Sequence, residues 1–221
     1  MARILITGST GMVGKGVLLE AIQDSNIDSI VLLNRSAIGM DHPKIEEVLL
    51  KDFSQVESVK TQIGLIDACF HCMGVSALGM TEEDYSRLTY DISTKLADVC
   101  YTINPAMTFI YVSGTGTDSS EKGSTMWARV KGKTENYILA KGFAKATMFR
   151  PGVIIPENGI RSRTKLYNVF FVLLSPIFPF LKKMSGVTTT TKIGKAMIVC
   201  MNKAQGRKVH LSNVDINALA V

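Results

Sequence analysis

The sequence predicts an α/β fold, in which a doubly wound parallel sheet has helices on both faces and carries a small C-terminal cap. Strand-like and helix-like hydrophobic periods alternate from residue 3 to residue 149, and a glycine-rich turn joins the first strand to the first helix. The pattern changes after Pro151. With 221 residues, of which 46% are hydrophobic, the chain is long enough to bury one sizeable core.

The alternating pattern covers the first two thirds of the chain. Most of the expected strands are short apolar runs, whereas the expected helices repeat their apolar residues at the helical period. Asn104 and Pro105 end the longest helix, and Gly142 ends the last helix of this part. Strands that alternate with helices pair in parallel through crossover connections. We expect strands at 3–7, 29–33, 45–50, 66–72, 106–113 and 144–149, and helices at 12–24, 54–63, 82–103 and 124–141.

The C-terminal part follows another pattern. An apolar stretch carries Pro176 and Pro179, and a helical segment and a short strand come after it. Because no linker or repeat interrupts the chain, we expect a single dinucleotide-binding domain with a small substrate or cap region. The domain covers 1–221, the cap region lies within 151–206, and the apolar stretch, helix and strand are expected at 164–184, 188–202 and 207–211.

Composition excludes several classes of protein. A net charge of +6, carried by dispersed basic residues, is too weak for a nucleic-acid-binding protein. Four cysteines do not form a disulfide framework, and the first strand begins too early for a leader peptide, so we expect a cytoplasmic protein. No apolar run reaches the ~18 residues that a membrane-spanning helix needs.

Cys69 and Cys72 have the spacing of a metal-binding or redox pair. They lie in an expected strand, where residues three apart point to opposite faces of the sheet. No second cysteine pair is present. We therefore interpret both as core cysteines and expect no metal site, with His71 in a structural role.

Gly8, Gly11 and Gly14 form the most informative motif. They follow a strand and open a helix, the context in which glycines allow a tight turn and a close approach to a pyrophosphate. The helix N-terminus then offers free N–H groups and partial positive charge to the phosphates. We predict nucleotide binding by a Rossmann fold, with further contacts from Ser9, Thr10, Met12 and Val13.

The end of the second strand indicates which nucleotide binds. An NAD site usually has an acidic residue there, whereas this chain has Asn34, Arg35 and Ser36. No carboxylate repels a 2′-phosphate, and a guanidinium can pair with it, so NADP is favoured over NAD. The alternative is that Arg35 is a solvated loop residue. Asp52 and Phe53, after the third strand, are expected beside the adenine.

Together these motifs resemble the short-chain dehydrogenase/reductase superfamily in its atypical or extended form. Within it the chain is similar to the Tat-interacting oxidoreductase-like group and to nucleoside-diphosphate-sugar epimerases. The resemblance implies that Met73 and Gly74 pass the nicotinamide ribose. It further implies that Pro151, Gly152 and Val153 close over the nicotinamide.

The resemblance also implies a catalytic set, of which one member is replaced. Ser113 would orient the substrate carbonyl, and Lys131 would hold the ribose and lower the pKa of a tyrosine four residues earlier. That position is Trp127, whose indole N–H does not ionise in the working range. Asp91 stands where the family often has an asparagine.

Three interpretations of Trp127 remain open at this stage. The indole forms a wall of the pocket in a non-catalytic NADP(H)-binding regulatory or sensor protein. Alternatively, Tyr111 or Tyr137 supplies the proton, or water does, and the chain is an oxidoreductase or epimerase-like enzyme of unknown substrate. Ser113, Trp127 and Lys131 are the candidate catalytic residues.

The most apolar stretch, 166–181, has basic residues on both sides. It is expected to cover a substrate cleft, with a subunit interface or a membrane-surface contact as alternatives. Pro176 and Pro179 argue against a spanning helix. The basic residues before it face either an anionic substrate or solvent, and the sequence leaves a monomer or a homodimer open.

Overall fold

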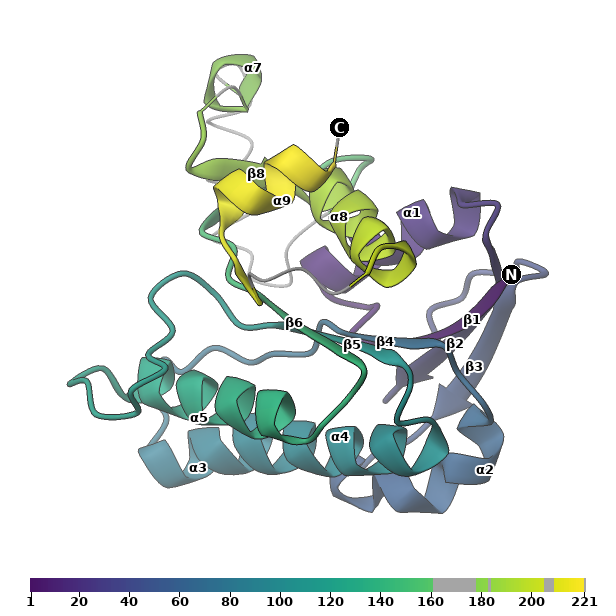
Figure 1. Ribbon diagram of the computed structural model, residues 1–221, viewed down its shortest axis with the longest axis horizontal. Coiled ribbons are helices and arrows are strands. Elements are labelled where there is room, and N and C mark those ends of the chain that lie inside the picture. Colours follow the sequence, from purple (N-terminus) through teal and green to yellow (C-terminus); the bar gives the residue numbers. More distant parts are fainter. Residues whose placement is uncertain (161–177, 183, 205–208, 221) are drawn as a thin grey trace.

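The computed structural model describes residues 1–160, 178–182, 184–204 and 209–220. Its centre is a seven-stranded sheet with the order β3-β2-β1-β4-β5-β6-β9, in which all neighbours pair in parallel (Figure 1). The strands are β1 (Ala2–Thr7), β2 (Ile27–Asn34), β3 (Ile45–Leu49), β4 (Ala68–His71), β5 (Thr108–Val112), β6 (Lys145–Phe149) and β9 (His210–Leu211). The predicted doubly wound parallel sheet is confirmed.

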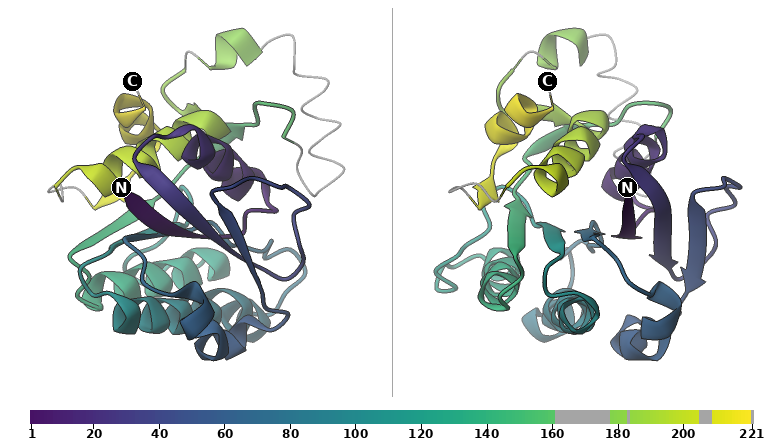
Figure 2. Two further views of the ribbon diagram at one scale, coloured as in Figure 1. Left: turned by 90° about the vertical axis from the view of Figure 1, so that its right-hand side faces the viewer. Right: turned by 45° about the vertical axis from the view of Figure 1, so that its right-hand side comes forward.

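Helices cover both faces of the sheet (Figures 1 and 2). A hydrophobic core lies on each face of the sheet. Because side chains alternate along a strand, Leu5 lies in one core and Ile4 and Ile6 lie in the other. One face is covered by α1 (Met12–Gln23), α8 (Thr190–Asn202) and α9 (Asn213–Leu219). The other is covered by α2 (Lys60–Ile63), α3 (Glu82–Ser86), α4 (Ile92–Ile103) and α5 (Met126–Ala140).

The helix expected at 82–103 forms as three consecutive segments, α3, a π-helical turn (η2, Arg87–Asp91) and α4. Thr81 caps its start, because its hydroxyl accepts a hydrogen bond from the Asp84 amide at 3.2 Å. Asn104 ends it, and its side-chain amide donates to the Ile66 carbonyl at 2.9 Å. The polar residues that the sequence places at the two ends therefore set the bounds of the helical run.

Several elements differ from the expectation. The helix expected at 54–63 is a 3₁₀ helix (η1, Phe53–Val59) followed by α2. The sequence pattern did not predict the two-stranded sheet of β7 (Val153–Ile155) and β8 (Val187–Thr189), nor α9, because strands of three residues and a helix of seven give too little periodicity. The apolar stretch 166–181 lies largely outside the described residues, which include its end as α7 (Phe178–Leu181).

The two motif cysteines pack on opposite faces of the sheet, as predicted. Cys69 lies in the core beneath α4 and α5, whereas Cys72 packs against the core beneath α1 and α8, and both are free thiols. His71 is buried, with Nδ1 2.6 Å from the Thr7 hydroxyl and Nε2 2.8 Å from the Ser93 hydroxyl. Burial lowers the pKa of His71 to about 3, so the imidazole is neutral. In the described parts of the chain, no helix has the length and apolar character needed to cross a membrane.

The strand order reverses between β1 and β4. From β1 the chain winds outward through β2 to β3, and then returns to β4 and winds the other way. In such sheets a crevice opens at the carboxyl ends of the two strands where the direction changes. Gly8 follows β1 there, and Met73 follows β4.

Candidate functional site: a dinucleotide cleft

The turn after β1 is built so closely that side chains do not fit. Gly8 has a φ of +73°, and a Cβ there would lie 2.8 Å from the carbonyl oxygen of Cys72 and the amide nitrogen of Met73. A Cβ on Gly14 would lie 2.3 Å from the carbonyl oxygen of Gly8. Glycine thus lets the turn approach β4 and lets α1 pack on the turn, as a phosphate-binding turn requires.

The N-terminus of α1 opens toward this turn. Gly11 occupies the cap position and provides no side chain to bind the first amides, and no acidic residue occupies the first turn. Its own amide donates to the carbonyl oxygen of Gly8 at 2.8 Å. The first turn of α1 therefore retains N–H groups and partial positive charge suited to a phosphate.

Ser9 and Asn34 connect the turn to the end of β2. Both side chains are buried, and they hydrogen bond to each other at 2.9 to 3.0 Å. Asn34 lines the cavity described below, whereas Ser9 does not, and the two polar side chains already satisfy one another. They hold the turn against β2, with Arg35 as the next residue of the chain.

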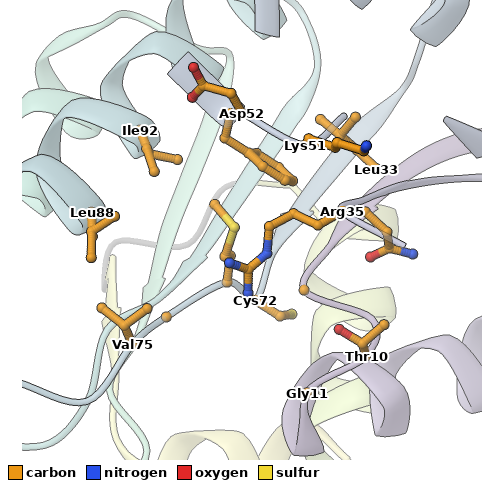
Figure 3. A pocket seen from close by; sticks show the side chains of 15 residues that line it. Thr10, Gly11, Leu33, Arg35, Lys51, Asp52, Cys72, Val75, Leu88 and Ile92 are labelled. Carbon is orange, nitrogen blue, oxygen red and sulfur yellow. The ribbon is translucent and has the colours of Figure 1, made fainter. Parts of the chain in front are cut away.

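A cavity of about 220 Å³ lies between the turn, β2 and the segment after β4. Arg35 extends into it toward Cys72, and Lys51 adds a second cation at its edge (Figure 3). Asp52 accepts hydrogen bonds from the Ser54 amide at 2.9 Å and hydroxyl at 2.8 Å, which lower its pKa. The predicted residues that line the cavity are Gly8, Thr10, Gly11, Asn34, Arg35, Asp52, Phe53, Met73 and Gly74.

Other predicted cofactor residues lie outside this lining. Ser9, Met12, Val13 and Gly14 belong to the turn and the first turn of α1, and Ser36 follows Arg35 on the chain. The cavity also includes Cys72 and Val75, which flank the predicted Met73 and Gly74, and four residues that the sequence analysis did not predict, namely Leu33, Lys51, Leu88 and Ile92. For Lys51, its position next to Asp52 after β3 was an available signal.

A second, open hollow adjoins the cavity, and Val75 lines both. Trp127 and Lys131 line it from α5, four residues apart and on one helical face. The Lys131 ammonium donates a hydrogen bond to the main-chain carbonyl of Ser113. Burial lowers the pKa of Lys131 to about 8, although the negative charge of Glu135 opposes the shift.

The model for the family described as "NAD dependent epimerase/dehydratase family" matches residues 4–148, well over half of the chain. The chain belongs to this family. The glycine turn, the end of β2 and the Trp127–Lys131 helix all lie inside the match. The class of cofactor that fits this cleft is therefore a pyridine nucleotide.

Curated relatives are similar over most of their length. The chain is 27% identical to "Protein fmp52, mitochondrial" of Emericella nidulans over 168 residues, which cover 72% of the chain and 69% of that protein. It is 28% identical to "Protein FMP52, mitochondrial" of Meyerozyma guilliermondii over 157 residues, which cover 71% and 66%. These relatives, named as mitochondrial, overturn the cytoplasmic location expected from the cysteines and the N-terminus.

Solved structures of other proteins share the fold. The Bordetella bronchiseptica enzyme WbmH in complex with NAD+ aligns with a TM-score of 0.70 and 16% identity over 100% of this chain and 79% of that one. The Helicobacter pylori ADP-L-glycero-D-manno-heptose-6-epimerase gives 0.69 and 15% over 96% and 76%. At such identities the likeness shows the Rossmann fold alone.

One position in this epimerase/dehydratase chain corrects the expected catalytic set. The hydroxyl of Ser113 points into the protein, where it donates to Glu135 Oε1 at 2.5 Å and lies 3.2 Å from the carbonyl oxygen of Phe149. It is not free to orient a substrate carbonyl. Gly114 and Thr115 come next on the chain, and Thr115 donates to the carbonyl oxygen of Arg150 at 3.0 Å.

Neither alternative tyrosine is available as a proton donor. Tyr111 is buried in the core, where its ring stacks on His71 at 5.3 Å and desolvation raises its pKa. Tyr137 donates its hydroxyl proton to Asp98 Oδ1 at 2.7 Å, and this hydrogen bond raises its pKa. The interpretations that assigned either residue to proton transfer are wrong for this geometry.

The predicted nicotinamide segment lies past the end of β6. The Thr115 amide donates to the carbonyl oxygen of Pro151 at 2.9 Å, and the Gly152 amide donates to the Asn213 side chain at 3.1 Å. Val153 begins β7 and is exposed. None of the three lines the two hollows described above, so their contact with the nicotinamide stays a prediction.

Glu135 is a site residue that the sequence analysis missed. Its side chain is 0% exposed, and Arg150 Nε lies 3.0 Å from Oε1 and 3.1 Å from Oε2. Arg150 also donates to the Ser119 hydroxyl at 2.5 Å. The position of Glu135 four residues after Lys131 on α5 was the available signal. This network ties α5, which carries Lys131, to the ends of β5 and β6.

Proposed function

We propose that this chain is an NADP(H)-dependent oxidoreductase in which the Lys131 ammonium, rather than a tyrosine, gives the proton to the substrate oxygen. The observation that carries the proposal is the position of Lys131 in a hollow that adjoins the dinucleotide cavity. A lysine whose pKa lies at about 8 is a competent acid near neutral pH. In this proposal Trp127 occupies the position of the family's tyrosine and fills the space beside the substrate.

The residues present fit a dinucleotide. At Gly8 and Gly14 the space that a Cβ would need is filled by neighbouring backbone, so only glycine allows this tight turn, which is the kind that binds a pyrophosphate. When bound, the nicotinamide supplies or accepts a hydride. The chain itself holds the phosphates at the start of α1, orients the substrate oxygen with Lys131 and moves a proton at that oxygen. The Lys131 ammonium has three N–H donors. One donates to the Ser113 carbonyl, so two are available for the ribose and the substrate.

The preference for NADP is supported by the charges at the adenosine end. Arg35 and Lys51 both line the cavity, and a 2′-phosphate there would gain charge-assisted hydrogen bonds. The carboxylate of Asp52 is bound to Ser54, which offsets part of its repulsion toward a phosphate. NAD has no phosphate on its adenosine ribose, so it offers these two cations no matching charge at that end of the molecule.

Replacing Arg35 with alanine is expected to weaken NADPH binding about tenfold or more, because a charged hydrogen bond contributes about 1.5–3 kcal/mol. NADH binding is expected to stay the same within error. Isothermal titration calorimetry of both nucleotides measures the difference. An equal loss for NADPH and NADH would remove Arg35 from the selection of the 2′-phosphate.

A second candidate function is a non-catalytic NADP(H) sensor, and Trp127 in place of a tyrosine is the observation that favours it. Trp127 is the only tryptophan of the sequence, so its fluorescence reports on the cleft. An enzyme is expected to oxidise NADPH when a panel of carbonyl compounds is offered. A sensor is expected to bind NADPH and NADP+ with different affinities and to turn over neither.

Trp127→Tyr separates these functions further. If the position still suits the family's proton donor, the tyrosine is expected to raise carbonyl reduction about tenfold, the lower part of the range for general acid catalysis. Stopped-flow oxidation of NADPH with wild type and variant gives the comparison. If the wild-type rate is substantial and the variant's rate is lower, the indole itself is needed. That result agrees with the Lys131 proposal, in which Trp127 forms a wall of the pocket.

A further inference from the structure

The hollow beside Lys131 is large enough for a small molecule. Its volume of about 510 Å³ lies within the ~300–1,000 Å³ typical of ligand sites. One side is the start of α5, with Met126 and Trp127, and the other is the segment after β4. The shared Val75 makes it continuous with the dinucleotide cavity, so a ligand here would lie next to a bound nucleotide.

Apart from the hydroxyl groups of Ser76 and Tyr85, the side chains that line this hollow are apolar, with a single charge. The described residues that line it include no carboxylate, and Lys131 is their one cation. Leu78 is 92% exposed, which leaves a whole aliphatic side chain in water at the rim. A ligand that covered Leu78 and the face of Trp127 would remove this apolar area from water. The aliphatic and aromatic lining residues are Val75, Ala77, Leu78, Tyr85, Met126 and Trp127.

A nucleotide sugar matches this lining poorly. Its diphosphate carries two negative charges that need several cations or N–H donors in a closed site. Arg35 and Lys51 serve the other cavity, and Lys131 already donates one hydrogen bond to the Ser113 carbonyl. The remaining donors of Lys131 suit a single oxygen atom on an otherwise apolar molecule.

We propose that the hollow formed by α5 and residues 75–79 is the substrate subsite, and that it takes an apolar carbonyl compound, an aromatic or long-chain aldehyde or ketone, rather than a nucleotide sugar. This inference rests on the proposed function, because Lys131 meets the carbonyl oxygen there. Trp127 and Leu78 bind the apolar body of the ligand. Trp127 in place of a tyrosine thereby favours apolar substrates.

Binding of prodan, a naphthyl ketone dye, to the full chain saturated with NADP+ tests the inference without turnover. Prodan emission is expected to shift to the blue on binding. Leu78→Asp and Trp127→Ala are each expected to weaken prodan binding at least about tenfold, because one places a carboxylate against an apolar ligand and the other removes its aromatic wall. NADP+ affinity, measured by calorimetry, is expected to stay unchanged in Leu78→Asp.

Leu65→Asp is the matched control, because Leu65 is a similarly exposed leucine, at 69%, that precedes β4 and does not line the hollow. It is expected to bind prodan like the wild type. If Leu78→Asp binds prodan as well as the wild type, or if UDP-glucose displaces prodan and binds more tightly, the inference is overturned. If NADP+ binds and prodan does not, the inference alone fails; if NADP+ does not bind, the proposed function fails with it.

Discussion

Replacing Lys131 with methionine is expected to lower carbonyl reduction by about 10²- to 10⁴-fold, the range that a positioned general acid contributes. Methionine keeps much of the length and apolar stem of lysine but carries no proton to give. Because burial holds the pKa of Lys131 near 8, the wild-type residue is both protonated at neutral pH and able to release its proton. Steady-state oxidation of NADPH with a carbonyl substrate measures the loss.

The pH dependence of the wild type provides an independent check. Lys131 is charged below its pKa of about 8 and loses its proton as the pH rises through that value. The rate of reduction is therefore expected to be level below this pH and to fall above it, about tenfold per pH unit for a single group. Alcohol oxidation is expected to show the opposite trend, because the neutral amine accepts the proton.

Lys131→Arg is the matched variant for this experiment. A guanidinium stays protonated throughout the range, so it keeps the charge but does not act as an acid. The break near pH 8 is expected to disappear in this variant, together with most of the activity. A wild-type profile without a break, or a break that survives in Lys131→Arg, would assign the proton transfer to water or to another group.

Replacing Glu135 with alanine is expected to destabilise the protein by about 3–5 kcal/mol, the cost of leaving a buried ionic partner unpaired. The Glu135 side chain is fully buried, and it holds Arg150 through three hydrogen bonds and Ser113 through a fourth. Removing the carboxylate leaves the Arg150 guanidinium and the Ser113 hydroxyl without their main partner. Equilibrium unfolding in urea gives the change in the free energy of unfolding.

Two further variants serve as comparisons for Glu135→Ala. Glu135→Gln keeps a side chain of the same size that can still accept from Ser113, so its loss is expected to be smaller than that of alanine. Glu57→Ala removes an exposed carboxylate that lies 3.4 Å from Lys60, and it is expected to cost less than about 0.5 kcal/mol. A Glu135→Ala variant as stable as Glu57→Ala would show that the buried network contributes little.

Much of the fold could be predicted because its signals are local. The spacing of Gly8, Gly11 and Gly14 after an apolar strand predicts the turn, and at each of these three glycines the neighbouring backbone leaves little or no room for a Cβ. The strands of the first 149 residues are apolar runs bounded by turns, so their order predicts a parallel sheet. The short β7, β8 and α9 were missed, because they depend on partners rather than on their own periodicity.

In the candidate site, too, some features can be predicted from local spacing and others cannot. Arg35 at the end of β2, and Trp127 and Lys131 on one face of α5, follow from spacing, and the structure places Arg35 in the cavity and the other two in the adjoining hollow. The orientation of Ser113 does not follow from spacing. It depends on Glu135, which lies 22 residues further along the chain.

The order and spacing of residues along the chain are enough to predict the nucleotide-binding turn, the doubly wound order of strands and helices, and a tryptophan where a tyrosine is expected before Lys131. Which polar groups remain free depends on the folded structure. It buries Tyr111, commits Ser113 to Glu135 and encloses Lys131 so that its pKa falls. Periodicity and turn chemistry act between neighbours on the chain, whereas burial and hydrogen-bond partners depend on segments that only folding brings together.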